Sequence, residues 1–147
     1  MKNNQPLQVQ IRDMLRQAQK ILIVTHIRTD GDAIGSLLGL GLSLEKMGKE
    51  IQMVINDHIP RIFNFLEGFD SIKNKCSDPF DLSIVLDCSD IIRTGNIFNG
   101  KKPDLNIDHH ITNEKFARIN YVEPQASATA ELLSKNMSNW DLPISPP

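Results

Sequence analysis

The apolar residues of this chain form short continuous runs, and longer amphipathic segments lie between these runs. Continuous apolar runs rich in β-branched residues are typical of strands buried on both faces of a sheet. The last run is more polar, as expected of an edge strand. The predicted strands cover residues 20–26 (KILIVTH), 50–57 (EIQMVIND), 81–87 (DLSIVLD), 103–108 (PDLNID) and, as the edge strand, 116–123 (FARINYVE).

Between these runs the apolar residues recur at helical spacing. We predict helices over residues 7–19, 32–47 and 124–140, and a short helix over 60–68. Gly48 follows the second helix at the position where a left-handed residue often ends one. Strands that alternate with helices indicate an α/β fold with a mostly parallel sheet and helices on both faces, a Rossmann-like three-layer arrangement.

Four glycines at the start of the predicted 32–47 helix and within it suggest how that helix packs. They are Gly31, Gly35, Gly39 and Gly41. A glycine inside an exposed helix costs about 1 kcal/mol relative to alanine. We therefore expect the helix to approach the sheet closely at these glycines, of which Gly35 and Gly39 are four positions apart and share one helix face.

Composition narrows the class of protein. The 147 residues carry a formal net charge of −2, whereas a protein that coats nucleic acid has a strong basic excess. A small phosphate substrate stays compatible with this charge, because bound metal ions would supply positive charge locally. The length corresponds to one domain with a substantial core.

Cysteine usage and hydropathy indicate a cellular compartment. Cys76 and Cys88 form no CxxC pair, which favours a reducing environment. The first 20 residues lack the apolar core of a signal peptide. No run approaches the roughly 18 apolar residues of a membrane span. We therefore expect a cytoplasmic protein with no membrane partner.

Acidic and imidazole side chains follow three of the predicted strands. In open parallel sheets, ligands bind outside the carboxyl ends of the strands, so these groups are expected to share one cleft. Singly, each has an ordinary structural explanation as a strand-end histidine, a turn or a helix cap. Three coincidences at three strand ends make a common site the better interpretation. The residues are His26, Asp30, Asp32, Asp87, Asp90, Asp108, His109 and His110.

Such a cluster needs positive charge. Carboxylates held close together repel one another, and unpaired buried charges are unfavourable. The nearest cations in sequence, Arg28 and Arg93, are too few to neutralise the group. Aspartate with histidine suits Mn²⁺ or a similar ion, and two ions about 3.5–4 Å apart would clamp a phosphoryl group. Arg93 itself is either a salt-bridge partner or a phosphate contact.

Three ordered motifs give the chain a family resemblance. The segments HIRTDGDAIGS (26–36), DCSDIIRTG (87–95) and DHH (108–110) resemble those of the DHH phosphoesterase superfamily, in its N-terminal domain. Within it, the chain resembles the branch of oligoribonucleases (nanoRNases) that also dephosphorylate 3′-phosphoadenosine 5′-phosphate. The segment ASATAELL (126–133) is similar to that branch as well.

The resemblance implies two Mn²⁺ ions, with Mg²⁺ or Co²⁺ as substitutes, and a bridging hydroxide that attacks phosphorus in line. Asp87 would bridge the two ions. His110 would face the scissile phosphate, Asp108 would orient the histidines, and Arg93 is a candidate phosphate contact. The implied ligands are His26, Asp30 and Asp87 for the first ion and Asp32, Asp87 and His109 for the second.

The sequence also departs from the family pattern. Thr29 stands where the family often has proline, and the fourth motif and the C-terminal substrate-binding domain are missing. We therefore expect residues 1–147 to be a DHH phosphoesterase domain cut short, which leaves open whether the chain itself is active. A homodimer also stays open.

The implied function is hydrolysis of short single-stranded RNA and of 3′-phosphoadenosine 5′-phosphate. Two alternatives within the superfamily are an inorganic pyrophosphatase and a cyclic-dinucleotide phosphodiesterase. A third is a non-catalytic metal-binding fragment. A dinucleotide site or a P-loop is disfavoured, because GDAIG lacks the GxGxxG spacing and the chain has no GK[ST].

Overall fold

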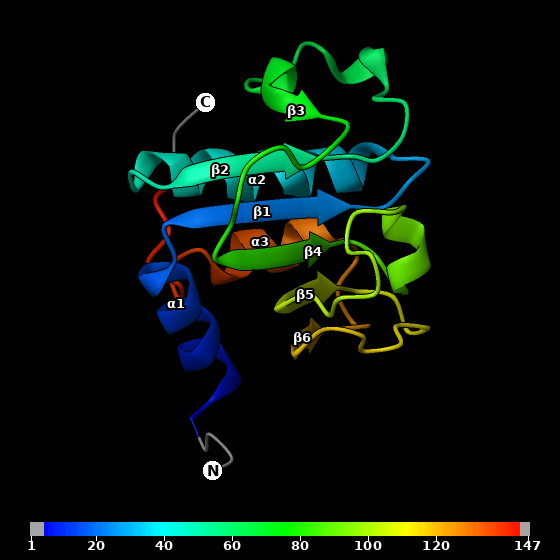
Figure 1. Ribbon diagram of the computed structural model, residues 1–147. Helices are drawn as coiled ribbons and strands as arrows, with labels where there is room; N and C mark the ends of the chain where they lie inside the picture. The colour runs from blue at the N-terminus through cyan, green and yellow to red at the C-terminus, as the bar shows by residue number, and fades with distance from the viewer. Residues whose placement is uncertain (1–4, 145–147) are drawn as a thin grey trace.

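Six parallel strands form one sheet in the computed structural model, which describes residues 5–144 (Figure 1). The strand order is β3-β2-β1-β4-β5-β6, so the order reverses between β1 and β4. Such a reversal is a topological switch point, beside which ligands commonly bind. The strands are β1 (Lys20–Thr25), β2 (Glu50–Val54), β3 (Ile72–Lys73), β4 (Leu82–Leu86), β5 (Leu105–Asp108) and β6 (Ile119–Val122).

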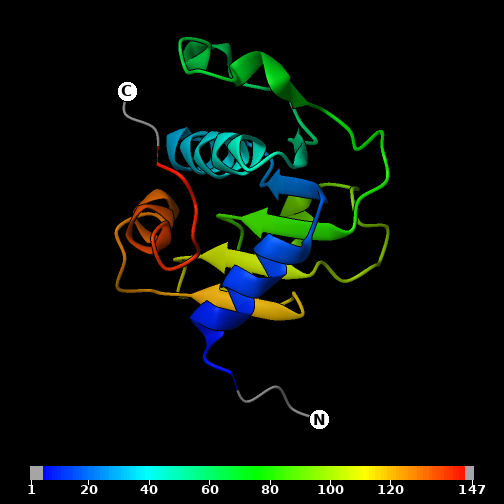
Figure 2. The same cartoon turned by 90° about the vertical axis from the view of Figure 1, so that its left-hand side faces the viewer.

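Within residues 5–144, three α-helices accompany the sheet. Helices α2 and α3 lie side by side along one side of it, and α1 crosses near the amino ends of the strands (Figure 2). Three short 3₁₀ helices lie in the connections. The α-helices are α1 (Leu7–Gln17), α2 (Gly31–Lys46) and α3 (Thr129–Asn136), and the 3₁₀ helices are η1 (Arg61–Phe63), η2 (Phe69–Ser71) and η3 (Ile91–Thr94).

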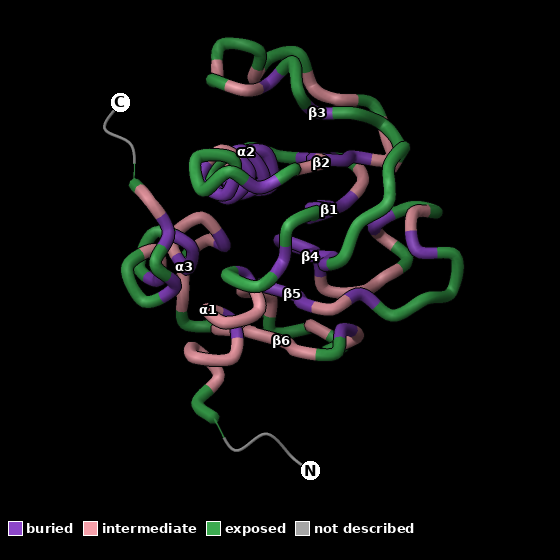
Figure 3. Tube along the Cα trace, turned by 60° about the vertical axis from the view of Figure 1, so that its left-hand side comes forward, coloured by how far each residue is buried: buried purple, intermediate pink, exposed green. Residues whose placement is uncertain are grey.

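The core has two parts because successive side chains of a strand point to opposite faces of the sheet. Ile21 and Ile23 of β1 belong to the larger cluster, together with apolar residues of all three α-helices. Leu22 and Val24 belong to a smaller cluster on the other face, and Phe98 is also buried in this cluster. Buried positions accordingly concentrate in the strands and in α2 (Figure 3).

The predicted α/β class with a parallel sheet is confirmed, and β6 is indeed at the sheet edge. One difference is that, within residues 5–144, the smaller cluster is covered by loops and η3 and not by an α-helix. The predicted 60–68 helix reduces to the single turn of η1, and the 124–140 helix reduces to α3. Strand β3 was not predicted, because two residues are too short to show periodicity.

The expected close approach to the sheet is confirmed at Gly41 and is wrong for Gly35 and Gly39. A Cβ atom at either position would meet nothing within 4 Å. Gly41 is the glycine that allows close packing, since its Cβ would lie 2.3 Å from the Met53 sulfur on β2. Gly48 does end α2 in the left-handed region, with φ +79°.

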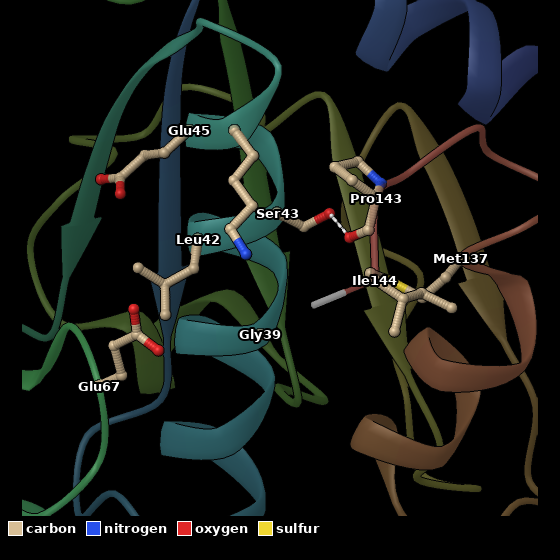
Figure 4. A pocket seen from close by; sticks show the side chains of 9 residues that line it. Gly39, Leu42, Ser43, Glu45, Glu67, Met137, Pro143 and Ile144 are labelled. Atoms are coloured by element: carbon tan, nitrogen blue, oxygen red, sulfur yellow. Dashed lines mark hydrogen bonds between the residues drawn. The ribbon is translucent and has the colours of Figure 1, made fainter. Parts of the chain in front are cut away.

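Gly39 of α2 borders a groove of about 470 Å³ (Figure 4). Gly39 and Leu42 line it from α2, and Met137 and Ile144 line it from the chain after α3. The groove contains none of the acidic or imidazole residues that follow the strands. It is therefore separate from the predicted cleft. No helix among residues 5–144 is long and apolar enough to cross a membrane.

Candidate metal centre

Strand register brings the predicted site together. Thr25, Leu86 and Ile107 are paired across β1, β4 and β5. The next residue of each strand or strand end is therefore in the same row at the carboxyl edge of the sheet. These three residues are His26, Asp87 and Asp108, and all are buried. The row straddles the switch point between β1 and β4.

Asp87 is the centre of the cluster. It is 1 % exposed, and its backbone is in the left-handed region, with φ +56°. The Asp87 amide donates to the Ile107 carbonyl at 3.0 Å, which anchors this turn to β5. Its two oxygens face opposite ways, with Oδ2 3.4 Å from His26 Nε2 and Oδ1 3.5 Å from His109 Nε2. One carboxylate thus joins two histidines.

All three histidines of the cluster have Nδ1 against an acceptor. His26 Nδ1 lies 2.6 Å from the Ile27 carbonyl oxygen, and His109 Nδ1 lies 3.3 Å from that of Ala126. His110 Nδ1 lies 2.6 Å from Asp108 Oδ1. We assign the proton to Nδ1 in each ring, which leaves the Nε2 lone pair free. Histidines that bind metals show this arrangement almost without exception.

The first group of donors comes from β1, β4 and the start of α2. One donor atom from each of His26, Asp30 and Asp87 lies within 4.8 Å of the others. Asp30 is the N-cap of α2, and its Oδ1 accepts a hydrogen bond from the Ala33 amide at 3.0 Å. The cap fixes Asp30 next to His26, at 3.8 Å from Nε2. These are the three residues predicted for the first ion.

The second group differs from the prediction in one member. Donor atoms of Asp87, His109 and His110 lie within 4.8 Å of one another. The predicted Asp32 is close to the group, with Oδ2 3.6 Å from His109 Nε2. However, its two oxygens also accept backbone hydrogen bonds from Thr129 and Ala130 of α3. Both Asp32 and His110 are therefore placed at this side of Asp87.

Burial and a neighbouring carboxylate disfavour the ionised form of Asp87. Burial raises the pKa of Asp87, and the nearby Asp32 raises it further, although the neighbouring His26 imidazole and a hydrogen bond from Thr129 oppose this. Burial lowers the pKa of His26, but the neighbouring Asp87 carboxylate and the Ile27 carbonyl outweigh that effect and raise the pKa overall. Carboxylate oxygens and imidazole nitrogens gathered in this way form a donor set that suits Mn²⁺ and similar divalent ions.

Asp108 and Asn113 support the third strand end. Asp108 is fully buried, and its Oδ2 accepts a hydrogen bond from Asn113 Nδ2 at 2.7 Å. Its other oxygen faces His110, so Asp108 fixes the orientation of that ring. Asn113 was not predicted, because it lies in a loop without periodicity and its partners are not its neighbours in the chain.

Arg93 and Asp90 lie at the rim of the cluster. Asp90 is the N-cap of η3, where its Oδ1 accepts from the Arg93 amide at 3.1 Å. The Arg93 guanidinium lies 3.4 Å from His26 Nδ1, and its carbonyl accepts from the Ile27 amide. No acidic side chain of residues 5–144 lies within ion-pair distance of the Arg93 guanidinium.

The comparison with protein families agrees with these motifs. The profile of the DHH family, N-terminal domain, matches residues 20–145. The chain belongs to the DHH family.

Individual relatives refine this result. The chain is 36% identical over 120 residues to the bifunctional oligoribonuclease and PAP phosphatase NrnA of Thermus thermophilus. The match covers 77% of this chain and 35% of that protein. It is 25% identical over 144 residues to the cyclic-di-AMP phosphodiesterase PdeA of Listeria monocytogenes, covering 85% of this chain and 22% of that one. The chain thus spans about a third or less of these relatives.

A solved structure shares the fold. The exopolyphosphatase-related protein of Bacteroides fragilis superposes with a TM-score of 0.82 at 27% sequence identity. The match covers 91% of this chain and 43% of that one.

Proposed function

We propose that the chain is the catalytic domain of a metal-dependent phosphoesterase that hydrolyses short RNA oligonucleotides and 3′-phosphoadenosine 5′-phosphate. The observation that carries this proposal is the common histidine arrangement, with three Nδ1 atoms on acceptors around one buried carboxylate. Family membership supports the phosphoesterase class. The name of the Thermus relative supports this pair of substrates.

The proposed ligands divide around Asp87. His26 and Asp30 would hold one ion with Asp87 Oδ2, and Asp32 and His109 would hold a second with Asp87 Oδ1. Such ions supply positive charge to a phosphoryl group and lower the pKa of a water molecule. Mn²⁺ is our proposal for both ions, with Mg²⁺ or Co²⁺ as substitutes.

The remaining residues would act on the substrate. Asp108 accepts a hydrogen bond from His110 Nδ1, so Nε2 stays available to the substrate. In the imidazolium form, in which both ring nitrogens carry a proton, Nε2 would donate to a phosphate oxygen or pass its proton to the leaving oxygen. The side chain of His110 is 37% exposed, whereas that of Asp87 is 2% exposed, so a substrate reaches His110 more easily. Arg93 has no carboxylate partner among the described residues, which favours a phosphate contact over a salt bridge.

The Listeria relative favours one second candidate. Its match covers more of this chain than the Thermus match does, at lower identity, and its name gives cyclic di-AMP as the substrate. A cyclic-dinucleotide phosphodiesterase would use the same ligands. The selection between substrates we assign to a further substrate-binding domain of the kind that the resemblance implies.

Two measurements test the proposed function. Calorimetric titration of the chain with Mn²⁺ should show two ions per chain, and phosphate release from 3′-phosphoadenosine 5′-phosphate should depend on Mn²⁺. Asp87→Ala should abolish both binding and release, whereas Asp90→Ala should retain both, because Asp90 only caps η3. Equal effects of the two variants would contradict the assignment of Asp87. Metal binding without hydrolysis of any RNA, nucleotide or cyclic dinucleotide substrate would instead indicate a non-catalytic metal-binding domain.

A further inference from the structure

We propose that Thr129 is a positioning residue that sets the orientation of the metal-binding carboxylates Asp32 and Asp87. This inference rests on the proposed function, because it concerns the same ligands. It also gives a role to the segment ASATAELL (126–133), for which the sequence provided a family resemblance but no function.

Thr129 contacts both carboxylates. It is fully buried, and its Oγ1 donates to Asp87 Oδ1 at 3.0 Å. Its amide donates to Asp32 Oδ2 at 3.0 Å, and the Ala130 amide donates to Asp32 Oδ1 at 2.9 Å. The first turn of α3 therefore holds two carboxylates that lie far away in sequence. Asp87 is 42 residues earlier in the chain and Asp32 is 97 residues earlier.

Helix α3 depends on this contact for its own cap. The first amides of a helix need acceptors, and the N-cap side chain usually provides one. Here the N-cap is Ala128, which offers no side-chain hydrogen bond. Asp32 of α2 takes that place, so the residue that caps α3 is also a proposed metal ligand. Docking of α3 and the geometry of the second ligand group are thereby linked.

The hydroxyl of Thr129 has a more specific effect than the cap. Asp87 must present Oδ2 to His26 and Oδ1 to His109 if it is to bridge two ions. The Thr129 hydrogen bond to Oδ1 restrains the rotation of that carboxylate. Each carboxylate oxygen can accept more than one bond, so Oδ1 keeps capacity for a metal ion. Hydrogen bonds of this kind to ligands typically change metal affinity by about 10–100-fold.

The test separates positioning from stability. Thr129→Val keeps the shape and the backbone amide but removes the hydroxyl. We expect it to weaken Mn²⁺ affinity by about 10–100-fold, measured by calorimetry, while Thr129→Ser stays within about threefold of the wild type. Where the valine variant does not fold, Thr129→Ala replaces it in the same comparison. The free energy of unfolding of each metal-free variant is measured by urea titration.

Ser83→Ala is the matched control. Ser83 is on the same strand β4 as the turn to Asp87, but at its amino end, and its Oγ donates to Asp104 Oδ2 at 3.1 Å. The control should lose stability and keep its Mn²⁺ affinity. Unchanged affinity in Thr129→Val, or equal loss in Ser83→Ala, would overturn the role of Thr129 alone. A wild-type chain that binds no Mn²⁺ would overturn the proposed function together with this inference.

Discussion

The two edges of the sheet use aspartate in opposite ways. At the amino edge, Asp81 accepts hydrogen bonds from the amides of Gln19 and Lys20, and Asp104 accepts from the amide and hydroxyl of Ser83. These hydrogen-bond donors are neutral; in addition, Asp104 Oδ1 lies 3.7 Å from Nε of the exposed Arg118. The hydrogen bonds satisfy both carboxylates within the fold and join neighbouring strands.

At the carboxyl edge, the partners of Asp87 are groups that titrate or carry charge. Two histidines face its oxygens and Asp32 lies nearby, while Thr129 supplies one neutral donor. The buried Lys49 does not neutralise this cluster, because its ammonium group donates to the Arg16 and Ala18 carbonyls at the end of α1. The difference between the edges shows how to separate structural aspartates from functional ones: by the type of partner, not by burial alone.

The largest effect that would sharpen this comparison concerns His110. In the metal-loaded chain, His110→Ala should reduce the rate of phosphate release by about 100-fold or more, because a general acid or phosphate contact is lost. The Mn²⁺ affinity should change by less than about threefold. Rate assays and calorimetry check the two parts separately. An affinity loss comparable to that of Asp87→Ala would make His110 a ligand, as its grouping with Asp87 and His109 allows.

An intermediate effect is expected at the opposite edge. Asp104→Ala leaves the Ser83 amide and hydroxyl without their acceptor and should lower the free energy of unfolding by about 1–3 kcal/mol. Asp104→Asn, which keeps one carbonyl oxygen, should recover part of this loss. Urea unfolding gives the stabilities and calorimetry gives the Mn²⁺ affinities. Any clear loss of Mn²⁺ affinity in either variant would break the distinction between the edges.

The smallest effect concerns Glu131, a partly exposed acid on α3 that belongs to neither edge. Lys135 and Ser127 lower the pKa of Glu131 from its ordinary 4.5 to about 2. A lowered acid pKa stabilises the fold above the unfolded value and loses this effect as pH falls through the folded value. The melting temperature of Glu131→Gln should therefore lie slightly below the wild type at pH 7, and the difference should shrink as the pH falls below about 4.5 and disappear only well below 2. Differential scanning calorimetry from pH 7 to the acid side of pH 2 is the measurement, and a difference that does not shrink over this range contradicts the assignment.

Much of the site was predictable because parallel strands place their carboxyl ends at one edge. The apolar runs predicted β1, β4 and β5, and the acidic and imidazole residues that follow these runs predicted the members of the cluster. His26, Asp30 and Asp87 lie close together as expected, because each follows directly from a strand end or a helix cap, and their role as metal ligands stays a prediction. Local sequence contains the information for such positions.

Helix packing was less predictable. The sequence showed that Gly35 and Gly39 share a helix face, but not what lies opposite that face. A glycine is tolerated both where a neighbour comes close, as at Gly41 against Met53, and where a groove is open. All three glycines belong to one helical pattern in the sequence, so only the packed structure separates the two cases.

By itself, the sequence determined the parallel α/β class, the row of acidic and imidazole residues and the family. The tertiary structure decided which atoms of these residues meet. The level register of His26, Asp87 and Asp108, and the approach of Thr129 to Asp32 across 97 positions, come from strand pairing and helix docking. Hydrogen bonds act over about 3 Å, so contacts between distant segments leave no spacing in the sequence from which they could be read.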